Sequence, residues 1–174
     1  TLLCLWTSMK LEYSKILKWF RYNCKEQMDR LFDSLSPNQI ECKEWLIESL
    51  DKVQIPRDEF GKFNIEIVGG WYGYPLIDLL YQKYGDEINR IDIFELDEFA
   101  CRAINKYNCI FKNCHVRVFH QDYFTYQEKR RTHMIINTSC EHMWDMSTNK
   151  DCYESPERTL LVLQSNNKTN EPDH

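Results

Sequence analysis

Residues 64–73, NIEIVGGWYG, join an apolar run to a turn that is rich in glycine. A helix-like segment from Tyr74 to Tyr84 follows, and a second apolar run, residues 91–95, ends on Glu95. Glycine lets the backbone approach a ligand closely, and a carboxylate at the end of the next strand can accept hydrogen bonds from two ribose hydroxyls. This stretch therefore predicts a βαβ unit that binds a nucleotide-type cofactor.

The chain repeats this alternation of strand and helix from residue 62 onwards. The predicted strands are residues 63–68, 91–96, 116–119, 134–136 and 160–163, and helical patterns occupy residues 75–84 and 97–107. Short continuous apolar runs are typical of strands that are buried on both sides. Strands that alternate with helices favour a parallel sheet covered on both faces, so the predicted fold class is α/β.

The first part of the chain has helical spacing instead. Apolar residues within 11–35 recur with the period of an amphipathic helix, with one break near Asn23. Ser36 and Pro37 mark the start of the next helix, with Gln39 placed to close a capping box.

These patterns divide the chain into three parts. We expect residues 62–174 to form the α/β core and residues 9–61 to form an N-terminal helical cap. Because the chain begins at Thr1 and Met9 begins a more natural opening, we expect residues 1–8 to be an added or upstream remnant.

Composition excludes some function classes. A chain of 174 residues buries a sizeable core without disulfides, so we interpret its eight cysteines as reduced thiols of a cytoplasmic protein. A net charge of −5 disfavours nucleic acid as a partner, because nucleic-acid binders usually show a basic face. No apolar run reaches the ~20 residues of a membrane span, so we expect no membrane partner.

Polar residues that follow the strands are the candidates for a site, because ligands of such a sheet bind at the carboxyl ends of its strands. The third predicted strand is followed by His120, Gln121 and Asp122. The fourth is followed by the densest polar cluster in the chain, which contains Asn137, Thr138, Ser139, Cys140, Glu141 and His142. Packing alone does not call for so many different polar groups within six residues.

Taken together, residues 62–165 resemble the class I S-adenosylmethionine-dependent methyltransferases. In that family a glycine-rich motif after strand 1 holds the methionine half of the cofactor, and an acid at the end of strand 2 binds the ribose. An acid after strand 3 contacts adenine, and the loop after strand 4 faces the substrate. The resemblance assigns cofactor binding to Glu66, Gly69, Gly70, Trp71, Gly73, Glu95, Gln121, Asp122 and Asn137.

The resemblance also implies a Rossmann-like parallel sheet with strand order 3-2-1-4-5 and S-adenosylmethionine as the cofactor. Two features depart from the family pattern. Val68 stands where the first glycine of the motif is usual, and the last glycine is displaced by one residue. The antiparallel hairpin that ends the family's sheet is missing from the sequence after residue 163. The segment from Asn137 to Met143 is also similar to methyltransferase-like proteins of tailed phages.

The expected reaction is in-line transfer of a methyl group to a small-molecule or amine-bearing acceptor. Relatives that methylate amines place Asn or Asp directly after strand 4, where the side chain orients the amine, and Asn137 matches that position. His142 is the best candidate for a general base, because its unperturbed pKa is near neutrality, and a structural role is the alternative. Glu141 and Cys140 complete the predicted catalytic set.

Two alternative functions stay open at this point, and two further ones are disfavoured. The first is an inactive methyltransferase-like binding or scaffold subunit. The second is an NAD-dependent oxidoreductase, which Glu95 fits but the glycine turn does not. Cys140 allows comparison with cytosine-5 methyltransferases, whose other motifs are absent. A metal site would need Cys109, Cys114, His115 and His120, whose spacing matches no standard zinc pattern, so we predict no metal.

Overall fold

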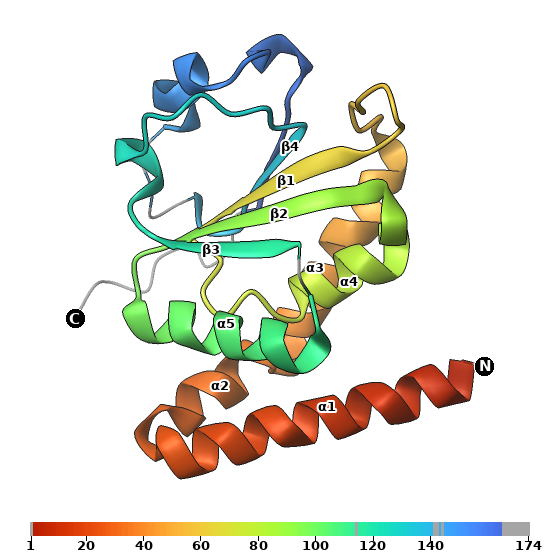
Figure 1. The fold of residues 1–174 in the computed structure, drawn as a ribbon, viewed down its shortest axis with the longest axis vertical. Helices are drawn as coiled ribbons and strands as arrows, with labels where there is room; N and C mark the ends of the chain where they lie inside the picture. The colour runs from red at the N-terminus through yellow and green to blue at the C-terminus, as the bar shows by residue number, and fades with distance from the viewer. Residues whose placement is uncertain (1, 114, 141–142, 144, 165–174) are drawn as a thin grey trace.

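The computed structural model of the chain describes residues 2–113, 115–140, 143 and 145–164 (Figure 1). Its centre is a sheet of five parallel strands in the order β3-β2-β1-β4-β5. The strands are β1 (Phe63–Val68), β2 (Ile88–Glu95), β3 (Val116–His120), β4 (Met134–Asn137) and β5 (Leu160–Leu163). This is the predicted α/β Rossmann-like sheet, with the predicted strand order.

Five α-helices accompany the sheet. They are α1 (Leu2–Asn23), α2 (Met28–Ser34), α3 (Pro37–Ser49), α4 (Leu76–Tyr84) and α5 (Glu98–Phe111). Helix α4 connects β1 to β2, and α5 connects β2 to β3, so both lie on the same face of the sheet (Figure 1). Helix α1 packs against α5, and α3 packs against α4.

The main hydrophobic core lies between these helices and the sheet. Alternate residues of β1 and β2, among them Ile65, Ile67, Ile91 and Ile93, face the helices and are fully buried. Side chains of a strand alternate between the two faces. The residues between them, such as Glu66, therefore face the other side.

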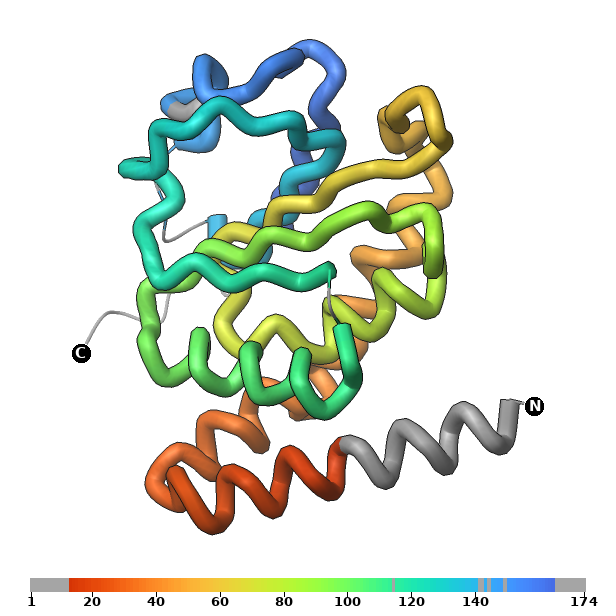
Figure 2. The backbone as a smooth tube through the Cα atoms, in the orientation of Figure 1, coloured from red at the N-terminus to blue at the C-terminus, as the bar shows by residue number. Residues whose placement is uncertain are grey.

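The other face is covered by residues 121–133 and by the described part of the connection between β4 and β5, chiefly residues 145–159, which Figure 2 shows running over the side of the sheet away from α4 and α5. Their helical segments are the 3₁₀-helices η4 (Tyr123–Thr125), η6 (Met146–Cys152) and η7 (Pro156–Arg158). A smaller hydrophobic cluster lies beneath them, made of Val68, Phe94, Tyr123, Ile135, Met146 and Tyr153. Helices of the described chain thus lie on both faces, long ones on one and short ones on the other.

Most local signals in the sequence are confirmed. The N-terminal helical pattern breaks at Cys24, Gly85 follows the last residue of α4, and the Asp97 side chain caps α5 by accepting from the backbone N–H of Ala100 (2.9 Å). Ser36 holds the N-cap position of α3, but its side chain makes no capping hydrogen bond there. Residues 2–8, expected as a remnant, belong to the continuous helix α1.

None of the helices in the described residues has both the length and the apolar character needed to cross a membrane.

A buried acid joins the N-terminal helices to the core. The Tyr13 hydroxyl on α1 donates a hydrogen bond of 2.5 Å to Asp78 Oδ2 on α4. Burial raises the pKa of Asp78 to about 6, although the bond from Tyr13 opposes that rise. The folded chain therefore keeps a proton on Asp78 at pH values where the unfolded chain has lost it.

We predict that Asp78→Asn removes a pH dependence of stability. A raised carboxyl pKa means that the folded state is favoured below about pH 4 and loses this advantage as pH rises through 6. Urea unfolding at pH 4 and 7 should show the wild type losing about 2 kcal/mol more than Asp78→Asn. Asp86→Asn, at an exposed acid, is the control and should follow the wild type; equal losses in all three proteins would contradict the prediction.

Candidate functional site

A tight turn follows β1 and carries three glycines. Gly69 (φ +63°) and Gly73 (φ +73°) lie in the left-handed region, which glycine adopts at little cost. Trp71 shares that region (φ +46°), which is uncommon for a bulky side chain. Hydrogen bonds from Gly69 N to Phe94 O (2.9 Å) and from Gly73 N to Gly70 O (2.7 Å) fix the turn.

Packing leaves little room for a side chain at Gly70 and Gly73. A Cβ on Gly70 would lie 2.8 Å from Cγ2 of Ile93, and a Cβ on Gly73 would lie 2.8 Å from Cδ1 of Ile77. A Cβ on Gly69 would overlap the Met143 side chain. Gly70 and Gly73 are therefore needed to seat the turn on β2 and α4, whereas Gly69 faces the loop after β4.

Glu95, the last residue of β2, fastens the turn. Its Oε2 accepts the backbone N–H of Trp71 (2.7 Å), and its Oε1 accepts those of Leu96 (2.8 Å) and Asp97 (2.9 Å). A carboxylate has about four acceptor positions, so three backbone partners leave it able to accept from a ligand hydroxyl as well. The acid predicted to end the second strand thus lies directly against the glycine turn.

One cavity of about 260 Å³ opens beside Glu95 at the carboxyl ends of β1 to β3. It brings together four predicted cofactor residues, namely Gly69, Glu95, Gln121 and Asp122. Its remaining wall is largely apolar, made of Val68, Phe94, Leu96, Tyr123, Phe124 and Met143. Asp122 also caps η4, because its Oδ1 accepts the N–H of Phe124 (2.9 Å).

A second cavity of about 250 Å³ lies on the other side of the turn. Residues 69–76, Thr138, Ser139 and Gln164 line it, together with Ser34, Gln39, Cys42 and Lys43 from the N-terminal helices. Each cavity is smaller than the ~300–1,000 Å³ of a typical ligand pocket. Because Gly69 belongs to both, a single extended ligand that crosses Gly69 would use the two cavities together.

The architecture is shared with known proteins. A methyltransferase from Aquifex aeolicus described as SAM dependent has a TM-score of 0.56 at 11% identity, over 80% of this chain and 73% of its own. Geranyl diphosphate C-methyltransferase from Streptomyces coelicolor, in complex with S-adenosylhomocysteine, has a TM-score of 0.52 at 14% identity. The YcgJ protein from Bacillus subtilis has a TM-score of 0.51 at 9% identity.

The chain has the fold of class I S-adenosylmethionine-dependent methyltransferases. The matches to the Streptomyces enzyme and to YcgJ each cover 71% of this chain. They cover only 42% of the Streptomyces enzyme and 49% of YcgJ, so this chain spans about half of their length. No protein-family profile and no curated protein matches the sequence.

Asn137 ends β4, as the methyltransferase pattern predicts, but its side chain does not face either cavity. Its side chain is fully buried, with Nδ2 donating to the sulfur atoms of Met143 and Met146 (both 3.4 Å). Its Oδ1 accepts the N–H of Ser139 (2.9 Å). Direct contact of Asn137 with cofactor or acceptor is therefore wrong for this conformation, and its role is to hold the loop after β4.

Of the other three predicted catalytic residues, the structure describes only Cys140. The Cys140 thiol is partly buried and donates to the carbonyl oxygen of Gln164 (3.4 Å), and Cys140 lines neither cavity. Glu141 and His142 lie outside the described residues, so their roles stay predictions. Of the metal alternative, Cys114 also lies outside, and the described chain has no group of three or more potential ligands.

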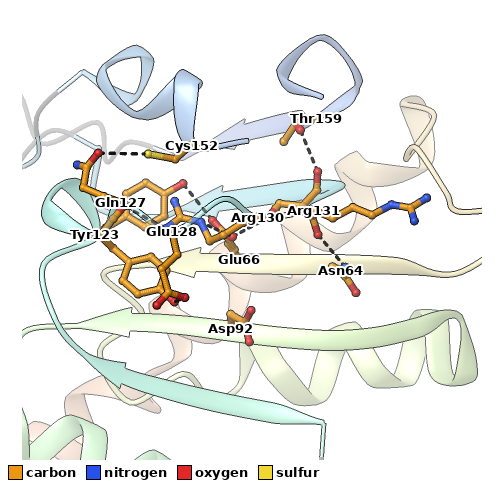
Figure 3. A network of polar contacts seen from close by, with 12 residues as sticks. Asn64, Glu66, Asp92, Tyr123, Gln127, Glu128, Arg130, Arg131, Cys152 and Thr159 are labelled. Atoms are coloured by element: carbon orange, nitrogen blue, oxygen red, sulfur yellow. Dashed lines mark hydrogen bonds and ion pairs between the residues drawn. The ribbon is translucent and has the colours of Figure 1, made fainter. Parts of the chain in front are cut away.

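Glu66 is the second correction. It is only 1% exposed and lies on the sheet face opposite α4 and α5 (Figure 3). It accepts hydrogen bonds from Thr132 Oγ1 (2.6 Å) and the Tyr123 hydroxyl (3.1 Å), and Arg130 Nε lies 3.0 Å away. Burial raises the pKa of Glu66, and Arg130 counteracts that rise. The carboxylate serves the structure instead of binding the cofactor's methionine half.

Arg130 is held by aromatic rings as well as by Glu66. Its guanidinium carbon lies 4.8–5.3 Å from the ring centres of Phe94, Tyr123, Tyr126 and Tyr153. Such cation–π contacts stabilise a guanidinium that has been removed from water. We call Glu66 and Arg130 the buried ion pair.

Sequence reasoning missed the contribution of the N-terminal helices to the second cavity. Gln164 Nε2 donates to the carbonyl oxygen of Cys42 (2.8 Å) across 122 residues of sequence. A contact at such separation leaves no periodic pattern. Met143 was missed as well, although its place within the polar cluster after β4 was a signal that could have drawn attention to it.

We predict strong coupling within the buried ion pair. Glu66→Gln or Arg130→Met alone leaves one buried charge uncompensated and should cost about 3–5 kcal/mol. The double variant should cost clearly less than the sum of the two, as measured by urea unfolding in a double-mutant cycle. The control is Lys83→Met, which breaks the more exposed pair with Asp51 and should cost at most about 1 kcal/mol. Small, additive losses would contradict a buried charge pair.

Proposed function

We propose that this chain is an S-adenosylmethionine-dependent methyltransferase that acts on a small-molecule or amine-bearing acceptor. The observation that carries the proposal is the glycine turn, which Glu95 binds through the Trp71 N–H and which separates two cavities that share Gly69. The fold of the neighbouring structures supports the same cofactor class.

The residues present fit the two halves of that cofactor. In the cavity beside β2, Glu95 would accept from a ribose hydroxyl and Asp122 from the adenine amino group, while Leu96 and Phe124 offer apolar contact. Beyond Gly69, the backbone of the turn and the Thr138–Ser139 segment would hold the methionine half. S-adenosylmethionine carries no phosphate group, which suits a turn that contains the bulky Trp71 side chain.

When bound, S-adenosylmethionine supplies a methyl group on a positively charged sulfur, which an acceptor lone pair attacks in line. The chain's contribution is to hold and orient the two reactants, and well-oriented groups gain much of the rate from that alone. Thr138, Ser139 and Lys43 line the cavity on the acceptor side. Asn137 fixes Ser139 through its hydrogen bond and so positions this segment. His142 stays the proposed base that takes the acceptor's proton.

The neighbours' names support the cofactor and leave the acceptor open. The Streptomyces enzyme was solved in complex with S-adenosylhomocysteine and geranyl diphosphate. A fold of this kind hosts many substrates, so this acceptor is not carried over to the present chain. An amine-bearing acceptor is proposed here on the resemblance alone, because the buried Asn137 does not present its side chain to an acceptor.

We predict that S-adenosylhomocysteine binds with micromolar affinity in titration calorimetry and that NAD gives no binding heat. Glu95→Ala should weaken binding at least about tenfold, because the ribose acceptor and the anchor of the turn are both lost. Glu98→Ala, at a nearby exposed acid on α5, should bind like the wild type. Thermal unfolding of each variant confirms that it is folded. A folded wild type that binds neither compound would refute the proposal.

Catalysis is tested separately from binding. Incubation with S-adenosylmethionine labelled in its methyl group and a panel of small amines should yield labelled product. We expect His142→Ala to reduce the rate by about 10²–10⁴-fold while S-adenosylhomocysteine affinity stays unchanged. Tight cofactor binding without any transfer would favour the inactive binding-subunit alternative.

A further inference from the structure

A cavity of about 700 Å³ lies on the sheet face opposite α4 and α5, over β1, β2 and β3. Five basic side chains line it, from Arg90, Arg117, Lys129, Arg130 and Arg131. Two acids, Asp92 and Glu128, are present with them. The cavity is thus locally positive in a chain whose net charge is −5. A local field of this sign attracts anions.

The acid at the floor of the cavity is already neutralised. Asp92 is 2% exposed and accepts from Arg117 Nε (2.7 Å) and Nη2 (2.8 Å) and from Arg90 Nε (2.8 Å). Each guanidinium has five N–H donors in a fixed plane, and Asp92 engages only part of each set. Arg90 and Arg117 are therefore oriented by Asp92 while they keep further donors for a ligand.

Arg130 adds a buried positive charge to the wall of the cavity. It is only 6% exposed, its Nε faces Glu66, and its Nη1 donates to the carbonyl oxygen of Tyr126 (3.3 Å). Because the guanidinium is enclosed, Arg130 contributes charge, whereas the more exposed Arg90 and Arg117 carry the donors that a ligand can reach.

We propose that this cavity binds a small phosphomonoester, with the phosphoryl oxygens held by Arg90 and Arg117 and attracted by the positive charge of the surrounding basic residues. Guanidinium groups match phosphate geometry because they donate two parallel hydrogen bonds. A nucleic acid is the less suitable ligand, because its binding needs an extended basic surface, whereas this cavity is a local basic site in an acidic chain.

This site is distinct from the proposed cofactor site. The cofactor cavity lies at the carboxyl ends of the strands, whereas the basic cavity reaches back to Asn64 and Arg90 near the beginnings of β1 and β2. Phe94 is the residue that both cavities share. A negative binding result at one cavity therefore does not decide whether the other cavity binds its ligand.

The test is titration of the full chain with orthophosphate and phenyl phosphate, with phenol as the uncharged probe. We expect both phosphates to bind with a dissociation constant of about 1 mM or below, weaker at high salt, and phenol to give no binding. Arg117→Gln should weaken phosphate binding at least about tenfold and leave S-adenosylhomocysteine binding unchanged. Arg102→Gln, at an exposed arginine on α5 away from the cavity, should bind like the wild type.

Thermal unfolding shows whether Arg117→Gln is folded, and Arg90→Gln serves as a second variant if it is not. Phosphate binding that is absent, that equals phenol binding, or that is unaffected in both folded variants would overturn the proposal. Retained cofactor binding in that case would leave the methyltransferase proposal intact.

Discussion

The burial of one carboxylate constrains much of this structure. Glu66 lies in the middle of the central strand β1, and its position in the alternation directs it away from the helices that form the main core. A carboxylate removed from water needs a counter-charge and hydrogen-bond donors. Arg130, Thr132 and Tyr123 supply them, and all three come from the connection between β3 and β4.

This pairing explains why an irregular connection covers that face. Residues 121–133 need not form a long helix there, because the buried ion pair and the rings around Arg130 fix them to the sheet. Asn64 adds two bonds to this connection: its side-chain Nδ2 donates to the carbonyl oxygen of Arg131, and its backbone N–H donates to Nδ1 of His133. The same connection carries Lys129 and Arg131 beside Arg130, and these side chains line the basic cavity together with Arg90 and Arg117 of β2 and β3.

The two faces of the sheet thus differ. One packs against the long helices in the main hydrophobic core, and the other carries the buried ion pair and the basic cavity. The carboxyl edge of the sheet carries the candidate site. Gly70 and Gly73 seat the turn against the apolar side, through Ile93 and Ile77. Glu95 then holds the turn from the end of β2, so the site rests on rigid elements. The N-terminal helices complete it by bringing Cys42 and Lys43 to the glycine turn. A change in how those helices dock would alter the second cavity more than the cavity beside Glu95.

Local signals in the sequence determined the elements and part of the site. The apolar runs, the Asp97 cap, Gly85 after α4 and Glu95 at the end of β2 all act within one or two turns of chain, so their patterns can be read directly. The resemblance to methyltransferases added the strand order. Tertiary structure decided which partners the polar residues meet. Glu66 and Asn137 resemble cofactor residues in sequence, but the path of two distant loops buries them under Arg130 and Met143, and no local pattern records a partner that folding brings from elsewhere in the chain.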